Sequence, residues 1–88
     1  MLGLVVSSNL VGGNGGVGLF FESGVSNFAV TGNFVGSAAG YGPNGSGLSV
    51  SGASDKYTIT GNMLFGNTGT NFSNTGSGSH QSATGNVY

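Results

Sequence analysis

The side chains that could perform acid–base chemistry are few in this sequence. Its 88 residues include two carboxylates, Glu22 and Asp55, together with Lys56 and His80. Hydrolysis of a glycosidic bond ordinarily requires two carboxyl groups that lie about 5–5.5 Å or 6.5–9.5 Å apart. The repeat described below places Asp55 over Ser26 of the preceding coil, and Ser26 lies four residues after Glu22. In an extended segment the two carboxylates are then about 13–14 Å apart. Glu22 and Asp55 are therefore weak catalytic candidates within one chain, although a bend or a second subunit could bring a pair together.

Lys56 and His80 offer basic groups without an accompanying site. A polysaccharide lyase would use a Lys or Arg base, often beside acids that hold calcium, and no acid cluster accompanies Lys56. His80 takes the place of Lys56 in the next repeat and has no neighbouring acid or cysteine in the sequence. Because protein metal sites combine several ligands, we predict no metal, no cofactor and no intrinsic catalysis. We expect these side chains at the surface or, for His80, against a partner subunit.

A loop offers a different kind of candidate, a sugar-binding site. Tyr41 lies in the segment Gly-Tyr-Gly-Pro-Asn at 40–44. Its ring presents a large apolar face on which a sugar could stack, and amide side chains suit sugar hydroxyls. Tyr41 and Asn44 are therefore candidate carbohydrate-binding residues. The alternative is that Tyr41 folds back onto the wall of the protein.

The composition excludes several classes of protein. Glycine (20), serine (13), asparagine (10) and threonine (7) make up more than half of the chain, only three residues are charged, and cysteine is absent. Good helix formers are scarce, which excludes a helical bundle. The net charge of −1 leaves no basic patch for nucleic acid, and no apolar run is long enough for membrane insertion as a helix. An all-β repeat and a flexible Gly/Ser-rich linker remain.

An internal repeat distinguishes these two possibilities. The octet at 28–35, Phe-Ala-Val-Thr-Gly-Asn-Phe-Val, aligns without gaps with Tyr-Thr-Ile-Thr-Gly-Asn-Met-Leu at 57–64. Related octets occupy 4–11 and 81–88, at equal offsets before the first of these and after the second. The sixth position is always asparagine: Asn9, Asn33, Asn62 and Asn86. This recurrence indicates a solenoid rather than a linker.

A second landmark of each repeat is an apolar residue between the octets, namely Leu19, Leu48 or Phe72. It shows where the repeat varies in length. The interval from this landmark to the next octet asparagine is the same in all three copies: Leu19 to Asn33, Leu48 to Asn62, and Phe72 to Asn86. The five additional residues of the longer repeat fall within 37–44. Because insertions in a solenoid map to loops on one side, we expect a single enlarged connection on an otherwise regular coil.

These spacings predict an all-β fold, a parallel β-helix of about 3–4 coils with a basic repeat of 24 residues. Residues 1–88 form a single segment of it. Apolar and polar residues alternate within the octets, as in strands with one buried face, so we expect the apolar columns to face inward and residues such as Thr31 and Thr60 to form an outward row of hydroxyls. The asparagines are expected at a bend, where Asn tolerates left-handed backbone and its amide bonds to the Asn of the next coil. The apolar columns are Val6, Val30, Ile59 and Ala83; Leu10, Phe34, Met63 and Val87; and Leu19, Leu48 and Phe72.

The central octets, with their Val-Thr-Gly-Asn-Phe-Val and Ile-Thr-Gly-Asn-Met-Leu motifs and the Gly-Leu strands that follow, resemble the coils of right-handed parallel β-helix proteins, the pectate-lyase-like superfold. That family includes polysaccharide lyases and hydrolases, bacteriophage tailspikes and surface adhesins. The chain looks most like a segment of a tailspike or tail fibre. This resemblance implies a structural and glycan-recognition role without catalysis, a virion-tail location and a cell-surface polysaccharide as partner.

Two alternatives are open within the same resemblance. The first is a segment of a bacterial surface adhesin or autotransporter passenger, located outside the cell. The second is part of a polysaccharide lyase or hydrolase with an active site between subunits. In each case the octets reach both ends of the sequence without a polar cap, and open solenoid ends need covering. We therefore expect a larger protein or an assembly of copies, either a homotrimer, as the resemblance implies, or an end-to-end stack.

Overall fold

The protein folds as a stack of parallel strands. The structure, a computed structural model, describes residues 3–37, 40 and 42–88. Every strand pairing in this part of the chain is parallel. The strands are β1 (Leu4–Ser7), β2 (Leu10–Val11), β3 (Val17–Phe21), β4 (Ser26–Thr31), β5 (Phe34–Val35), β6 (Ser46–Val50), β7 (Asp55–Thr60), β8 (Phe72–Asn74) and β9 (Gln81–Thr84).

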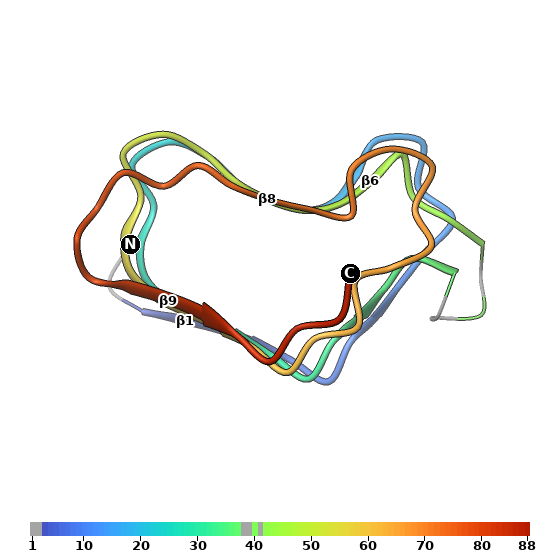
Figure 1. Cartoon of the computed structure of the whole chain (residues 1–88), viewed down its shortest axis with the longest axis horizontal. Coiled ribbons are helices and arrows are strands. Elements are labelled where there is room, and N and C mark those ends of the chain that lie inside the picture. The colour runs from blue at the N-terminus through green and yellow to red at the C-terminus, as the bar shows by residue number, and fades with distance from the viewer. Residues whose placement is uncertain (1–2, 38–39, 41) are drawn as a thin grey trace.

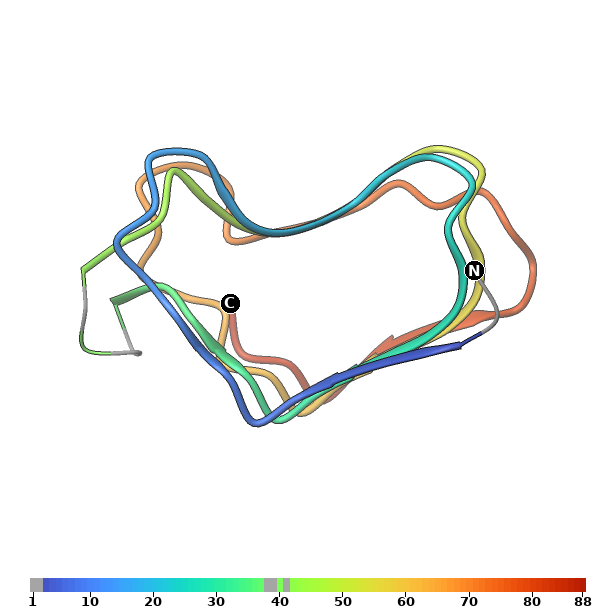
Figure 2. The ribbon, with the colours of Figure 1, turned by 180° about the vertical axis from the view of Figure 1, so that it is seen from behind.

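The strands form three sheets, and each coil of the chain passes through them in succession. The sheet orders are β1-β4-β7-β9, β2-β5 and β3-β6-β8. Isolated bridges carry the β2-β5 sheet on to Met63 and Val87. Viewed along the axis, successive coils superimpose, as Figure 1 shows and as Figure 2 shows from behind. The protein is therefore a parallel β-helix of about three coils.

The register between stacked strands follows the repeat in the sequence. Phe28 of β4 pairs with Leu4 of β1 and with Tyr57 of β7. Leu48 of β6 pairs with Leu19 of β3 in the same way. The predicted alignment is confirmed, because in a solenoid the offset between repeats is also the register between neighbouring strands.

The interior is filled by the inward-facing residues of the three sheets. Val30 and Ile59, which are paired across neighbouring coils, are fully buried. The rings of Phe21, Phe28 and Tyr57 stack in parallel, with centroids 4.2 Å and 4.7 Å apart. Parallel strands lie about 4.7–4.9 Å apart, so paired aromatic residues such as Phe28 and Tyr57 stack face to face. These columns hold the β1-β4-β7-β9 sheet, whose outer face carries the site described below.

One apolar column lies on the outside, contrary to the expectation from the sequence. Leu10, Phe34 and Val87 are 57%, 41% and 49% exposed, and Met63 is half-buried. The inward position is the next one along the chain, and Val35 there is fully buried. The octet asparagines turn into the interior, so strand alternation places the residue after each of them outside.

The octet asparagines form the predicted ladder. Asn33 and Asn62 are fully buried. Asn33 Nδ2 donates to Asn62 Oδ1 at 2.9 Å, and Asn62 Nδ2 donates to Asn86 Oδ1 at 2.9 Å. The left-handed residue at this bend is the preceding glycine, with φ of 67° at Gly32 and 66° at Gly61. The expectation that Asn itself adopts the left-handed conformation is therefore wrong, and its contribution is the amide group.

Candidate functional site

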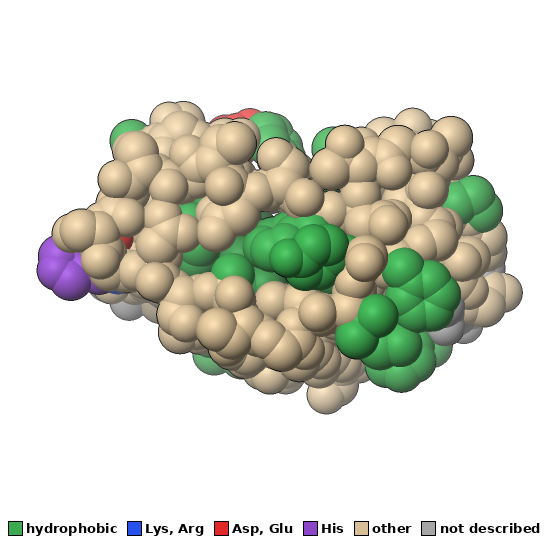
Figure 3. Space-filling model, in the orientation of Figure 1, with side chains coloured by type: hydrophobic (Ala, Val, Ile, Leu, Met, Phe, Trp, Pro, Cys, Tyr) green, Lys and Arg blue, Asp and Glu red, His purple; other side chains and the backbone are tan. Residues whose placement is uncertain are grey.

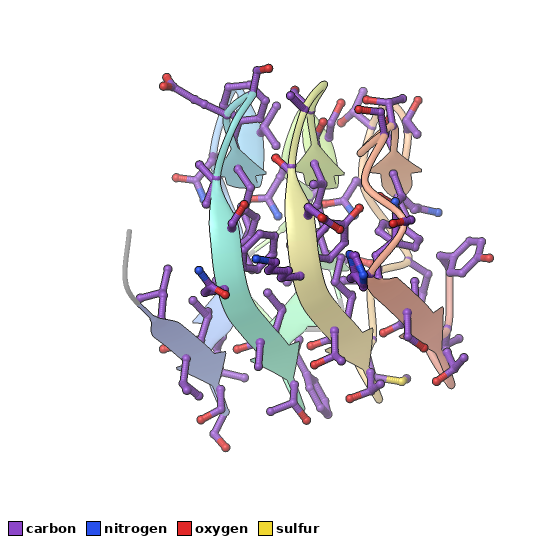
Figure 4. All side chains as sticks on the ribbon, turned by 90° about the vertical axis from the view of Figure 1, so that its left-hand side faces the viewer. Carbon is purple, nitrogen blue, oxygen red and sulfur yellow. The ribbon has the colours of Figure 1, made fainter. Side chains whose placement is uncertain are left out.

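The outer face of the β1-β4-β7-β9 sheet is hollowed into a groove that crosses all its strands. The groove has a volume of about 680 Å³ and is lined by 3–5, 27–29, 56–58 and 80–82. These triplets lie in register, because Phe28 pairs with Tyr57 and Tyr57 pairs with Gln81. Figure 4 shows this side of the molecule, with side chains projecting from successive strands. Ligand clefts have volumes of about 300–1,000 Å³, so the groove is large enough for a ligand.

Strand alternation and a bend give the groove its shape. The middle residue of each triplet points inward, and Phe28 and Tyr57 are buried, so the residues on either side line the groove. Asn27 and Lys56 have left-handed backbone, with φ of 61° and 56°. This conformation costs an L-residue about 1–2 kcal/mol and is most readily adopted by Gly, Asn and Asp. Lys56 is therefore held in an unfavourable conformation that presents it on the wall of the groove.

The chemical character of the groove changes along the axis of the β-helix. The column before the buried position is Gly3, Asn27, Lys56 and His80, and the column after it is Val5, Ala29, Thr58 and Ser82. The end at the first coil offers small or apolar groups at Gly3 and Val5, and the second coil adds the amide of Asn27 and the methyl group of Ala29. The end at the last coil offers an amine, an imidazole and two hydroxyls, which can all donate hydrogen bonds to oxygen atoms of a ligand.

Asp55 and His80 form a contact beside the groove that the sequence did not predict. Asp55 Oδ1 accepts the backbone N–H of His80 at 2.8 Å, and Asp55 Oδ2 lies 3.2 Å from His80 Nδ1. The backbone N–H groups of His80 and Lys56 lower the pKa of Asp55, because hydrogen bonds to a carboxylate favour its charged form. The expectation that no acid neighbours His80 is wrong, since the sequence offset of 25 from Asp55 to His80 amounts to about one coil. Asp55 thus orients the imidazole of His80 on the wall.

The two carboxylates have different surroundings. Asp55 is engaged by His80. Glu22 is exposed just beyond β3, and its side chain has no hydrogen-bond or ion-pair partner among the residues that the structure describes. Its backbone carbonyl accepts a hydrogen bond from Ser54 Oγ at 3.1 Å. Lys56 is exposed and forms no ion pair within 3–37, 40 and 42–88, so its amine is free to contact a ligand in the groove.

A polar cluster under the groove supports the segment that carries His80. The Tyr57 hydroxyl lies 2.5 Å from Asn74 Oδ1 and 2.6 Å from Gln81 Oε1. Gln81 Nε2 donates to the carbonyl of Gly76 at 2.6 Å and to that of Gly78 at 3.1 Å. Burial raises the pKa of Tyr57, because it disfavours the phenolate. Tyr57 therefore remains a neutral hydroxyl at neutral pH and helps to fix the connection that precedes His80.

The two residues predicted to bind sugar, Tyr41 and Asn44, belong to the enlarged connection, and their outcomes differ. Tyr41 lies outside the described residues. Asn44 is fully buried; its Nδ2 donates to Asn67 Oδ1 at 3.0 Å, and its Oδ1 accepts Asn14 Nδ2 at 2.8 Å. The side chain of Asn44 is out of reach of a sugar, so its prediction as a carbohydrate contact is wrong. Asn44 is a rung of a second asparagine ladder.

This second ladder was missed because its spacing is irregular. Asn14 and Asn44 lie 30 residues apart, whereas Asn44 and Asn67 lie 23 apart. The ladder ends at Asn71, whose Oδ1 accepts Asn67 Nδ2 at 3.2 Å. A signal was present, because Asn14, Asn44 and Asn67 each stand four or five residues before the second landmark of their coil. Distances measured to that landmark, rather than between the asparagines, would have found it.

Comparison with known proteins adds no relative. No protein-family model matches the sequence, and neither a curated protein nor a solved structure matches it. The class of the protein, a parallel β-helix, therefore rests on its own strand pairing and asparagine ladders. Across the described ranges, no helix is long and apolar enough to cross a membrane. Over the same residues, no three His, Asp or Glu side chains come together as metal ligands would.

Proposed function

We propose that this β-helix is a structural and glycan-recognition segment, of the kind that bacteriophage tailspikes and tail fibres use, and that it binds polysaccharide without cleaving it. The observation that carries the proposal is the groove across β1, β4, β7 and β9, which is lined at equivalent positions in every coil. A linear polymer lying along the axis meets the same two columns again at each step of about 4.8 Å. The location that goes with this role is a virion tail.

The polar half of the groove suits a sugar chain. Lys56 and His80 donate hydrogen bonds from one column, and Thr58 both donates and accepts from the other. The apolar half, at Val5 and Ala29, suits the less polar faces of sugar rings. Because the chain carries only three charged residues, recognition depends on hydrogen bonds and shape rather than on a strong electrostatic field.

We limit the proposal to binding because the chain has only two side-chain carboxylates and one of them, Asp55, is engaged by His80. Asp55 is turned to His80, and the side chain of Glu22 has no partner in the described part of the chain. A glycosidase requires two carboxyl groups at a fixed separation across the scissile bond. A bacterial surface adhesin would use the same groove in the same way, and it remains the alternative source of such a segment.

A glycan array probed with the purified protein tests the proposal, followed by titration calorimetry on any glycan that binds. We expect Ala29→Trp to fill the groove and abolish binding, whereas Ser49→Trp, on the outer face of β6, leaves affinity within about twofold. Lys56→Gln should weaken binding about 10-fold, as expected when a charged hydrogen-bond donor is lost. Silence across the array, or equal binding by the two tryptophan variants, would refute the proposal.

One observation favours a second function, cleavage of the bound glycan. Asp55, His80 and Lys56 gather beside the groove, and a carboxylate that holds Nδ1 of an imidazole prepares the other ring nitrogen to accept a proton. Incubation with a bound polysaccharide and size-exclusion analysis of the products tests this function. Depolymerisation that disappears in Asp55→Asn would show that the protein is an enzyme and would overturn the non-catalytic proposal.

A further inference from the structure

An apolar stripe runs along the outside of the β-helix on a wall that the groove does not use. It consists of Leu10, Phe34, Met63 and Val87, one residue from each octet, paired in that order. Three of the four are more than 40% exposed. Phe65, two residues after Met63, is also 38% exposed. In Figure 3, hydrophobic side chains gather on the outer wall at the lower right as well as in the open interior at the centre.

The asparagine ladder turns these residues outward, and their exposure does not result from imperfect core packing. Buried residues such as Val35 and Leu64 occupy the inward position beside it. Polar residues at the outward position of this bend would cost the core nothing. The neighbouring outward row, which includes Thr31 and Thr60, is polar. Soluble proteins seldom expose a contiguous apolar patch unless the patch is a site of interaction.

The octets that carry the stripe contain no charged side chain. Asp55 and Lys56 begin β7, and Met63 follows the end of that strand. About six strand residues, or roughly 20 Å, therefore separate those charges from the stripe. The flanking row consists of hydroxyls, which can exchange hydrogen bonds with another neutral surface. Two copies of this wall can meet without like-charge repulsion and without burying an ionised group.

We propose that the apolar stripe is a self-association surface, occupied by the stripe of a second copy of this chain. A matching surface must present apolar groups in a straight row at the spacing of stacked strands, about 4.8 Å. The second copy meets that requirement on every coil, so the contact is self-complementary, as the interface of a two-fold dimer must be. The proposal is independent of glycan binding, because the stripe and the groove lie on different sheets.

The size of the wall indicates the class of interface that it can form. The molecule measures 33 × 20 × 20 Å, so contact over a 20 Å square removes roughly 400 Å² from each copy. The total of roughly 800 Å² is below the 1,200–2,000 Å² of stable complexes and belongs with transient contacts. We therefore expect a weak, reversible dimer.

Sedimentation equilibrium of the protein between 10 µM and 1 mM tests the proposal. The double substitution Leu10→Thr and Phe34→Thr keeps residues that suit exposed strand positions, and we expect it to weaken dimerisation at least 10-fold. The matched control is Phe20→Thr, which removes an aromatic ring that is 54% exposed on β3, and it should leave dimerisation unchanged. Circular dichroism establishes that each variant is folded.

A cross-linking experiment gives a second measurement that does not depend on destabilising changes. The sequence has no cysteine, so Met63→Cys places a single thiol at the middle of the stripe, and Phe20→Cys places one on another wall. We expect Met63→Cys to form a disulfide-linked dimer at least 10-fold faster under mild oxidation. A monomer up to 1 mM, unchanged association in the stripe variant, an equal loss in Phe20→Thr, or equal cross-linking of both thiols would each overturn the proposal.

Discussion

Removal of one buried rung of the octet ladder provides the most direct test of how this fold is held together. The side chain of Asn62 bridges three coils. Its Oδ1 accepts both N–H groups of Asn33, from the backbone at 2.9 Å and from Nδ2 at 2.9 Å. Its Nδ2 donates to the carbonyl of Val30 at 3.0 Å and to Asn86 Oδ1 at 2.9 Å. Asn62→Ala deletes all of these bonds at a site that solvent does not reach.

The expected loss of stability follows from the groups that the substitution leaves unpaired. The backbone N–H of Asn33 loses its acceptor, and the carbonyl of Val30 loses a donor. A buried polar group without a partner costs about 1–3 kcal/mol, so Asn62→Ala should lower the free energy of unfolding by about 3–5 kcal/mol. A chain of this length is stable by on the order of 4–13 kcal/mol, so the substitution removes a large part of the total.

Asn9→Ala is the matched control for this experiment. Asn9 is exposed in the first coil, and its Nδ2 donates to Asn33 Oδ1 at 3.0 Å. That oxygen keeps a second donor, the backbone N–H of Asn9 at 3.0 Å, so the control should lose less than about 1 kcal/mol. Urea denaturation followed by far-ultraviolet circular dichroism measures both values. Equal losses in Asn62→Ala and Asn9→Ala would show that the ladder does not stabilise the coils through buried hydrogen bonds.

Three further predictions concern the groove wall and the coil corners. The pKa of Asp55 is lowered in the folded protein. The stabilisation by its carboxylate is therefore complete above the unfolded pKa of about 3.9 and is lost as the pH falls through the folded pKa. The thermal midpoint should then fall less steeply below about pH 4 in Asp55→Asn than in the wild type. Tyr57→Phe keeps the ring stack but removes the hydroxyl bonded to Asn74 and Gln81, and it should cost about 1–2 kcal/mol in urea denaturation. Gly36→Ala should cost about 3–5 kcal/mol, because φ is +128° and the new Cβ would collide with the Phe65 carbonyl oxygen.

Each of these predictions has a control variant or a result that would contradict it. Glu22→Gln removes a carboxylate that has no hydrogen-bond partner in the described part of the chain, so a similar flattening of its pH profile would contradict the role given to Asp55. Wild-type stability in Tyr57→Phe would show that the hydroxyl contacts are dispensable. Gly61→Ala also has left-handed φ, at +66°, but its Cβ meets nothing within 4 Å, so it should cost only about 1–2 kcal/mol. An equal loss at Gly36 and Gly61 would contradict the steric argument.

The repeat in the sequence was sufficient to predict the strand pairing. The octet alignment, which equates Phe28 with Tyr57 and Tyr57 with Gln81, became the observed register of β4, β7 and β9. This prediction succeeded because a solenoid makes its long-range contacts between equivalent positions of adjacent repeats. The alternation within each octet also predicted which side of this sheet is buried, because the period of a strand is two residues.

The candidate site was less accessible to the same reasoning. Lys56 and His80 were correctly placed in one column, but the contact of Asp55 with His80 depends on the path of the connection at 76–80. That path is fixed by hydrogen bonds from Gln81 to the carbonyls of Gly76 and Gly78, and side-chain contacts of this kind leave no periodic signal. Asn44 was misjudged for a similar reason, since a loop asparagine has the same composition whether it faces solvent or a ladder.

The sequence by itself determined that this chain is a parallel β-helix, because spacing alone specifies which strands stack and where the octet asparagines meet. Tertiary structure alone decided which way side chains face after each bend. A left-handed residue such as Gly32 resets the alternation, so the side on which Phe34 lies cannot be counted from Val30. The apolar stripe and the groove both arise from such bends, the first beyond Gly32 and the second at Asn27 and Lys56. The two surfaces to which we assign function are thus set by backbone dihedral angles, whereas the scaffold that carries them is set by the repeat.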